Sequence, residues 1–502
     1  MLRVKKEASF ASKVAAFPYQ LETVESIKSL EYAAIFHEQG LGKTKIAIDL
    51  SLTWLTEKTL DSVVIITKKG LIRNWEEEIA THSHFKAKTI DQNPKTLFYA
   101  FNTPARIYLT HYETCKSAQR SFALFLKTRR VGAICDESQK IKNPDSAVAH
   151  ALHELSKGFN RRVIMTGTPI ANRPYDIWSQ IWFLDQGKSL GNDFATFRAD
   201  LDLPQEDAGT TGRTLFAEAL SGILEKIQAF TVRKTKASSG IILPSKVVEN
   251  VKVHFESQQQ RLYNRFRDEL SAEVVRNSKT VTDDAEAILK RLLRLVQVAS
   301  NPALVDESYK GMPAKFPKLQ SILNSAIRGG SKAIVWTSFT ENADWLAREL
   351  AAYGAVKVHG KMSIEDRNSA IARFKNDFDT KVFVATPGAA KEGLTLTVAN
   401  YAVFYDRSFS LDDYLQAQDR IHRISQKSTC YVYNLLVEDS IDEWVNELLC
   451  AKHLAAQLGQ GDITRKDFSE KMSYAFSAML ADVLNVRGEQ KTNKLYSYER
   501  IK

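Results

Sequence analysis

A glycine-rich segment followed by lysine and threonine comes directly after an apolar stretch near the N-terminus. The run AAIF leads into HEQGLGKTKIAIDL, in which Gly40, Leu41 and Gly42 precede Lys43 and Thr44. Glycines let the backbone wrap a phosphate, and the first N–H groups of a following helix point at it. The pattern predicts a nucleoside triphosphate loop in which Lys43 reaches the β- and γ-phosphates and Thr44 holds magnesium.

This segment departs from the usual phosphate-loop pattern at one position. The pattern GxxxxGK[ST] has a glycine where His37 stands in this chain. Taken alone, GLGKT is therefore also compatible with a flexible start of a helix.

Two adjacent carboxylates farther along the chain favour the phosphate loop. Asp136 and Glu137 follow the apolar run VGAIC. Carboxylates that follow a strand of an open parallel sheet lie where a nucleotide binds. We expect Asp136 to hold magnesium through water and Glu137 to orient or deprotonate the attacking water. The alternative is a solvated turn, which an isolated Asp-Glu pair usually forms.

Short apolar runs alternate with amphipathic stretches over most of the chain. Alternation of strands and helices is typical of parallel sheets covered by helices. The runs fall into two sets, so the sequence predicts an α/β fold with two lobes. The expected strands are residues 33–36, 62–67, 106–110, 131–135 and 162–166 in the first set and 332–337, 356–359, 381–386, 401–406 and 431–436 in the second.

Changes of pattern along the 502 residues predict where the parts of the chain begin and end. We expect a first lobe over residues 1–245, with a helical insertion at about 174–230. A helical protrusion and linker over 246–314 lead to a second lobe over 315–450. A helical tail follows over 451–502.

Composition narrows the class of protein. No run of about 18 apolar residues is present, and the N-terminus has no continuous apolar core of a signal peptide, so we expect a cytoplasmic protein with no membrane partner. The four cysteines are isolated, which predicts neither a zinc ribbon nor a disulfide framework. The net charge of +10 favours a polyanionic partner, although many basic proteins bind no nucleic acid.

Further segments follow these in a fixed order, and together they resemble the motifs of superfamily 2 helicases of the Swi/Snf, chromatin-remodeller-like branch. HEQGLGKT is similar to DEMGLGKT, and DESQKIKN is similar to DEAHRIKN. The resemblance runs from about residue 17 to residue 445. The other segments that carry it include FPYQLETV (17–24), MTGTPIAN (165–172), FTVRKTK (230–236), KAIVWTSFT (332–340) and QAQDRIHRISQ (416–426).

The resemblance implies two RecA-like lobes, ATP and Mg²⁺ as cofactors, and DNA as the partner. It also implies that the chain is a DNA-dependent ATPase, in a minimal form that suggests a bacterial or viral source. At three positions the chain departs from the motifs: His37 replaces an acidic residue, Gln139 a histidine and Ser425 a glycine. None of these changes removes a group that binds phosphate, holds magnesium or activates water.

The resemblance also assigns roles around the nucleotide. Gln20 is the expected adenine contact, and Gly393 and Gln416 are expected to contact the nucleotide from the second lobe. Arg420 and Arg423, three residues apart on a predicted helix, share one face. We interpret them as arginine fingers that stabilise charge on the transferring phosphoryl group. The alternative is a pair of surface ion pairs.

DNA contacts are expected at positions that match those at which the family touches the phosphate backbone. These are Thr110, Ser338 and Thr386, with Lys68 as a weaker candidate. Backbone contacts carry no base code, so binding of duplex or branched DNA should depend little on sequence. The predicted function is an ATP-driven DNA translocase. The alternatives are a strand-separating or branch-migrating helicase and, in another class, a non-catalytic DNA-binding module with a decayed ATPase site.

Overall fold

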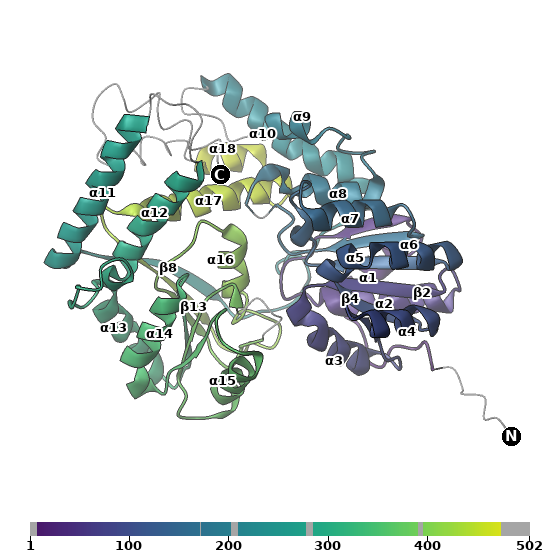
Figure 1. Cartoon of the computed structure of the whole chain (residues 1–502), viewed down its shortest axis with the longest axis horizontal. Helices are drawn as coiled ribbons and strands as arrows, with labels where there is room; N and C mark the ends of the chain where they lie inside the picture. The colour runs from purple at the N-terminus through teal and green to yellow at the C-terminus, as the bar shows by residue number, and fades with distance from the viewer. Residues whose placement is uncertain (1–7, 171, 202–208, 278–284, 390–394, 473–502) are drawn as a thin grey trace. The chain divides into compact units, whose positions relative to one another are not determined.

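The computed structural model describes the chain except for residues 1–7, 171, 202–208, 278–284, 390–394 and 473–502 (Figure 1). The chain divides into two compact units. Unit 1 comprises Met1–Leu201, Ala219–Ile241 and Gly459–Gly461, and unit 2 comprises Asp202–Glu218, Ile242–Leu458 and Asp462–Lys502. The described residues of each unit form one sheet. None of the helices among the described residues is long and apolar enough to cross a bilayer.

The sheet of unit 1 is parallel throughout, in the order β3-β4-β2-β5-β6-β1-β7. Its strands are β1 Tyr32–Ile35, β2 Ser62–Thr67, β3 Lys88–Ile90, β4 Ile107–His111, β5 Val131–Asp136, β6 Arg161–Met165 and β7 Thr231–Val232. The helices are α1 Pro18–Ile27, α2 Lys43–Thr56, α3 Ile72–His82, α4 Pro94–Asn102, α5 Tyr112–Ser117, α6 Gln119–Thr128, α7 Ala147–Ser156, α8 Trp178–Asp185 and α9 Phe194–Ala199, together with α10 Gly209–Ile227, which begins in unit 2 and belongs to unit 1 from Ala219 onward.

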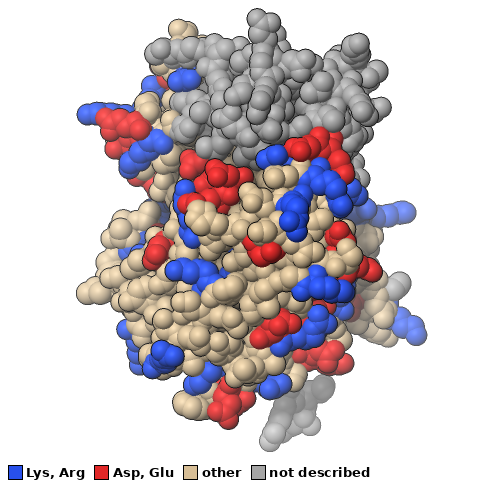
Figure 2. All heavy atoms as spheres, turned by 90° about the vertical axis from the view of Figure 1, so that its left-hand side faces the viewer, with Lys and Arg blue, Asp and Glu red and all other residues tan. Residues whose placement is uncertain are grey.

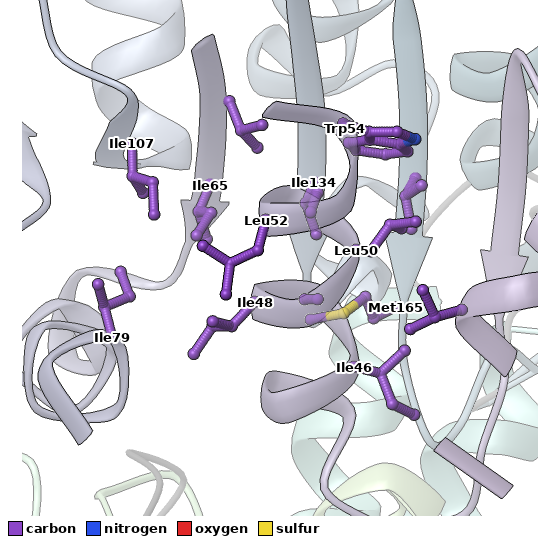
Figure 3. Packing of buried hydrophobic residues seen from close by; sticks show 14 of the residues in the cluster. Ile46, Ile48, Leu50, Leu52, Trp54, Ile65, Ile79, Ile107, Ile134 and Met165 are labelled. Carbon is purple, nitrogen blue, oxygen red and sulfur yellow. The ribbon is translucent and has the colours of Figure 1, made fainter. Parts of the chain in front are cut away.

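Helix α2 packs its apolar side chains on one face of this sheet (Figure 3). Ile48 and Leu52 lie against Ile65 and Ile134 of the neighbouring strands β2 and β5, and all four are almost fully buried. Burial of one such side chain contributes about 1.5–3 kcal/mol. The packing therefore fixes α2, and with it the loop that precedes the helix, on the sheet.

The sheet of unit 2 is also parallel, in the order β10-β11-β9-β12-β13-β8. Its strands are β8 Lys246–Val253, β9 Ala333–Trp336, β10 Val356–Val358, β11 Val382–Ala385, β12 Tyr401–Phe404 and β13 Cys430–Val437. The helices are α11 Ser257–Asn277, α12 Ala285–Ser300, α13 Lys315–Arg328, α14 Thr340–Glu349, α15 Ile364–Asn376, α16 Leu411–Gln418, α17 Ile441–Gly459 and α18 Arg465–Lys471.

Both faces of the second sheet are covered by helices (Figure 1). Successive side chains of a strand point to opposite faces. In β9, Ile334 and Trp336 join one core with α15 and α16, whereas Ala333 and Val335 join the other with α13 and α14. A strand buried on both faces is continuously apolar, which explains why KAIVWT is recognisable from sequence.

The predicted α/β class with two sheets is confirmed, and each expected strand is present within two residues of its predicted ends. Strands β3, β7 and β8 were not expected. Strands β3 and β7 span only three and two residues. Strand β8 (KVVENVKV) lies at the edge of its sheet and buries only Val251. An edge strand exposed to solvent lacks the apolar run on which the prediction depended.

Candidate nucleotide site

The loop between β1 and α2 has the backbone that glycine permits. Gly40 and Gly42 both have positive φ values, 86° and 65°, and Gly42 precedes the first residue of α2. A Cβ atom on Gly42 would lie 2.6 Å from Nε2 of Gln20. Glycine is therefore required at this position both for its left-handed backbone and for the close approach of α1.

The side chain of Lys43 folds back onto this loop. It is 9% exposed, and its Nζ donates hydrogen bonds to the carbonyl oxygens of His37, at 2.9 Å, and Glu38, at 3.3 Å. Thr44 follows in the first turn of α2. The ammonium and the N-terminal end of the helix thus meet at one point, which is the arrangement that binds a phosphate.

Helix α1 is hydrogen-bonded to the same loop. The hydroxyl of Tyr19 donates to the carbonyl of Leu41 at 2.8 Å, and Nε2 of Gln20 approaches the same oxygen at 3.4 Å. Oε1 of Gln20 accepts a hydrogen bond from the backbone N–H of Phe17. Gln20 is buried, and its amide lies beside the phosphate loop. Its role as the adenine contact remains a prediction.

His37 ties the loop to two other segments. The hydroxyl of Thr23 donates to the carbonyl of Tyr19, so it accepts from Nε2–H of His37 at 2.8 Å. Nδ1 of His37 accepts from the backbone N–H of Lys234 at 3.2 Å. Burial, followed by the charges of Lys43 and Arg233, lowers the pKa of His37 to about 3. The imidazole is therefore neutral and bonded at both nitrogens where the resembled motif carries an acidic residue.

We expect His37 to make stability depend on pH. Because its folded pKa lies below the unfolded value of 6.5, the unfolded chain binds a proton first as the pH falls. Stability should be full above pH 6.5 and decrease by about 1.4 kcal/mol per pH unit below it. Between pH 7 and pH 5, the free energy of unfolding measured with denaturant should fall by about 2 kcal/mol more for the parent than for His37→Gln. An equal loss in both proteins would contradict this assignment.

Asp136 lies at the carboxyl end of β5 and is held by three side chains. Its Oδ2 accepts hydrogen bonds from Nε1 of Trp75 at 2.9 Å and from the hydroxyl of Thr67 at 3.2 Å. Its backbone carbonyl accepts from the hydroxyl of Tyr112 at 2.8 Å. The hydrogen bond between Trp75 and Asp136 was not predicted from the sequence. The sequence signal that could have indicated this contact is the tryptophan shortly after β2, at the carboxyl edge of the sheet where the nucleotide site is expected.

The charges around Asp136 include that of Lys43 in the phosphate loop. Burial, and next the charge of Glu137, raise the pKa of Asp136 to about 6. The charges of Lys43 and Lys68 act in the opposite direction. Register explains the proximity, since Ile35 of β1 and Asp136 of β5 both pair with Met165 of β6. The chains that follow these three strands therefore begin at the same level of the sheet.

Glu137 has a strained backbone. Its φ is 54°, a conformation that costs a non-glycine residue about 1 kcal/mol or more. A short 3₁₀ helix, η2 Ser138–Ile141, follows immediately. Oε2 of Glu137 accepts a hydrogen bond from Nε2 of Gln139 at 2.5 Å. This bond orients the carboxylate, and the role of Glu137 in activation of water remains a prediction.

Glu137→Gln should bind ATP and lose turnover by about a hundredfold or more, because an amide accepts no proton from water. The amide oxygen still accepts from Gln139, so the local structure should persist. Phosphate release measures turnover, and retention of a fluorescent ATP analogue measures binding. Turnover near the parent value would remove Glu137 from the role of general base.

The two arginines of the second lobe do not lie on a helix, contrary to the prediction. Helix α16 ends at Gln418, and Arg420 and Arg423 lie in the turns that follow. Beyond the end of the helix, Nε of Arg423 donates to the carbonyl of Asp419, and the N–H of Leu396 donates to the carbonyl of Arg420, which a continuous helix would use. The Arg423 guanidinium also donates to the hydroxyl of Thr395 at 3.0 Å. The turn fixes its direction.

The expected DNA contacts lie in different environments. Thr110 is fully buried in β4, and its hydroxyl donates to the carbonyl of Ile90 at 2.9 Å. Ser338 follows β9, and its N–H donates to the Asp406 carboxylate at 2.6 Å. Thr386 follows β11 and is 8% exposed. All three positions remain predictions as sites of DNA contact.

The remaining predicted residues lie near strand or helix ends. Lys68 directly follows β2, and its charge acts on Asp136. Gln416 is buried in α16, and its Nε2 donates to Oδ1 of Asp412 at 2.8 Å. Gly393 lies outside the described residues.

Comparison with known families identifies the chain. The model of the SNF2-related domain matches residues 19–304. The chain belongs to this family. The helicase conserved C-terminal domain matches residues 314–425, so this member of the SNF2-related family carries both parts of a helicase-like ATPase.

Similar proteins include a protein of Mycoplasma genitalium named as an ATP-dependent helicase, 26% identical over 85% of this chain and 40% of its own length. The RAD54-like DNA repair and recombination protein of Drosophila virilis is 26% identical over 86% of this chain and 60% of its own length. This SNF2-family chain thus spans about half the length of these relatives. The Sulfolobus solfataricus SWI2/SNF2 ATPase core in complex with dsDNA is 24% identical over 93% of this chain and 99% of its own, with a TM-score of 0.43.

Proposed function

We propose that this chain hydrolyses ATP and uses the energy to move along duplex DNA. One observation carries the proposal: Lys43, Asp136 and Glu137 gather at the carboxyl edge of one parallel sheet in a member of a helicase-like ATPase family. Parallel α/β sheets bind their ligands at this edge. Lys43 supplies positive charge for the phosphates, and Glu137 supplies a base for water.

Magnesium fits the residues at this edge. Thr44 is proposed to hold the ion directly and Asp136 through water. Asp136 is a partly buried carboxylate beside a second carboxylate, which favours a bound cation. Mg²⁺ is usually held by one or two protein oxygens together with substrate phosphates. The ion supplies charge that neutralises the phosphates. Among the described residues, no cluster of three or more His, Cys, Asp and Glu side chains forms a separate metal cage.

Unit 2 is proposed to complete the reaction. Arg423, with Arg420, would stabilise the charge that develops on the γ-phosphoryl group. Binding of ATP would then join the two units, and hydrolysis would release them. Repetition of this cycle converts hydrolysis into steps along DNA. The division into lobes at residues 1–245 and 315–450, with a helical protrusion and linker over 246–314, remains a prediction. Strand β8, at the start of that segment, belongs to the second sheet.

DNA would be held through its phosphates, by groups such as Thr110, Ser338, Thr386 and Lys68. Figure 2 shows one face of the molecule, on which basic and acidic side chains are interspersed. Outside the atoms drawn in grey, this face therefore shows no continuous basic surface to which DNA could bind. Binding through phosphates weakens steeply with salt and ignores base sequence. A protein with this activity works where ATP and DNA are available, and we propose a cytoplasmic location.

The proposed function is tested by the effect of nucleic acids on ATP hydrolysis. Phosphate release is measured with no nucleic acid, duplex DNA, single-stranded DNA, branched DNA and RNA. We expect duplex or branched DNA to raise turnover about tenfold or more, which corresponds to about 1.4 kcal/mol of activation free energy. Stimulation by single-stranded DNA alone would favour a strand-separating helicase. Absence of hydrolysis under all conditions would favour a non-catalytic DNA-binding module.

A further inference from the structure

One side chain of the phosphate loop, that of Gln39, extends across the edge of the sheet. Gln39 lies in the loop after β1, and its side chain lies flat against Gly167, two residues beyond the end of β6. A Cβ atom on Gly167 would lie 2.6 Å from Cγ and 2.8 Å from both Cδ and Nε2 of Gln39. Only glycine at position 167 admits this amide.

In this position against Gly167, the N–H donor of the Gln39 amide lacks an acceptor among the described residues. Nε2 of Gln39 is buried and has no hydrogen-bond partner among the residues that the structure describes. A buried donor that lacks an acceptor is costly, and such an atom at a functional edge calls for a ligand oxygen.

A second glutamine at the same edge has the complementary feature. Gln139 is 7% exposed and donates through Nε2 to the carboxylate of Glu137. Its Oε1 is buried and lacks a donor within the described part of the chain. One glutamine therefore offers an unused donor, and the other an unused acceptor next to the proposed base.

Strand order places these two glutamines on either side of one strand. The order β5-β6-β1 puts β6 between the strands that lead to Gln139 and to Gln39. Ile35 and Asp136 share Met165 as their register partner, so both connecting segments start at one level. Gln39 has already crossed from β1 onto Gly167 after β6, toward the side where Glu137 and Gln139 lie.

We propose that Gln39 and Gln139 hold the terminal phosphate of ATP and the attacking water against Glu137. Nε2 of Gln39 donates to a γ-phosphate oxygen. Oε1 of Gln139 accepts a hydrogen bond from one O–H of the water, while Glu137 accepts a hydrogen bond from the other. This assignment rests on the proposed ATPase function. The motifs that these segments resemble, DEMGLGKT and DEAHRIKN, carry methionine and histidine at the two positions, so the glutamine pair is a feature of this chain.

In the reaction, the water oxygen forms a bond to the γ-phosphorus while the bond from that phosphorus to the β–γ bridging oxygen breaks. ADP leaves with the electron pair of the broken bond. One water proton passes to Glu137, and the other stays on the phosphate that is formed. Gln39 contacts the group that changes charge, and Gln139 fixes the direction from which the water attacks.

Gln39→Met tests the donor, since methionine is unbranched, of similar length and unable to donate. We expect kcat without DNA to fall about tenfold, as for the loss of one hydrogen bond formed in the transition state, with KM for ATP little changed. Binding of ADP should be unchanged, whereas binding of ADP with aluminium fluoride, which mimics the transferring phosphoryl group, should weaken about tenfold. The exposed Gln92→Met is the matched control and should behave like the parent.

Combining Gln39→Met with Gln139→Met tests whether the two residues act on one group. If they share the phosphate and its water, the double variant should lose clearly less than the product of the single losses. Purely multiplicative losses, equal weakening of ADP and of the aluminium fluoride complex, or kcat of Gln39→Met within about twofold of the parent would each overturn the inference. A parent protein without ATPase activity would instead overturn the proposed function itself.

Discussion

Lys43→Ala is expected to abolish ATP hydrolysis, with a fall in kcat of about a thousandfold. The ammonium that Lys43 carries is the cation of the phosphate loop, and its Nζ also bonds the carbonyls of His37 and Glu38. Removal of the side chain thus deletes charge at the β- and γ-phosphates and frees two loop carbonyls. Phosphate release under saturating ATP measures the effect.

A change of charge elsewhere in unit 1 provides the control for this variant. Lys86 is exposed, and Lys86→Ala should hydrolyse ATP without DNA at the parent rate. Thermal unfolding of both variants shows whether the fold is retained. Turnover of a folded Lys43→Ala protein at the parent rate would contradict assignment of this loop to phosphate binding.

Arg423→Ala is expected to lower ATP hydrolysis by about a thousandfold while ATP is still bound. Unit 1 supplies the phosphate loop, so affinity should change little. Arg423 is oriented by the carbonyl of Asp419 and the hydroxyl of Thr395, which gives its guanidinium one direction. A guanidinium in a fixed direction stabilises developing charge without reorganising during the reaction.

The controls for Arg423 separate charge from geometry. Arg423→Lys keeps the charge but loses the planar fork, and should recover only part of the activity. Arg328 is exposed at the end of α13, and Arg328→Ala should match the parent. A large loss of ATP affinity in Arg423→Ala, with turnover of the bound ATP unchanged, would contradict the role of an arginine finger.

Much of the scaffold could be predicted because its signals are local. The apolar runs that form β5 and β9 are buried on both faces, so they read as strands without any knowledge of their neighbours. The glycines of the phosphate loop are likewise local, since their left-handed backbone excludes other residues. Strand β8 was missed because its side chains face solvent at a sheet edge, where no apolar run is required.

The contacts that refine the site depend on register and could not be predicted. Trp75 bonds Asp136 because β2 and β5 are neighbours, and Gln39 meets Gly167 because β6 pairs with β1. The spacing of these residues along the sequence does not indicate that β2 pairs with β5 or that β6 pairs with β1. The helix predicted through Arg420 and Arg423 failed for the same reason, since Leu396, distant in sequence, takes a carbonyl that a continuous helix would use.

Movement along duplex DNA is the central claim, and displacement of a third strand tests it most directly. Separation of a duplex costs about 1.4 kcal/mol of stacking per step, and freed strands re-pair unless a wedge or trap intervenes. A motor that tracks the duplex should instead displace obstacles in its path. A long duplex that carries a triplex-forming strand is compared with a blunt duplex in which one strand is labelled. The account predicts ATP-dependent release of the third strand, abolished in Lys43→Ala, with the blunt duplex intact. Efficient unwinding of the blunt duplex, or a third strand that stays bound while ATP is hydrolysed, would contradict it.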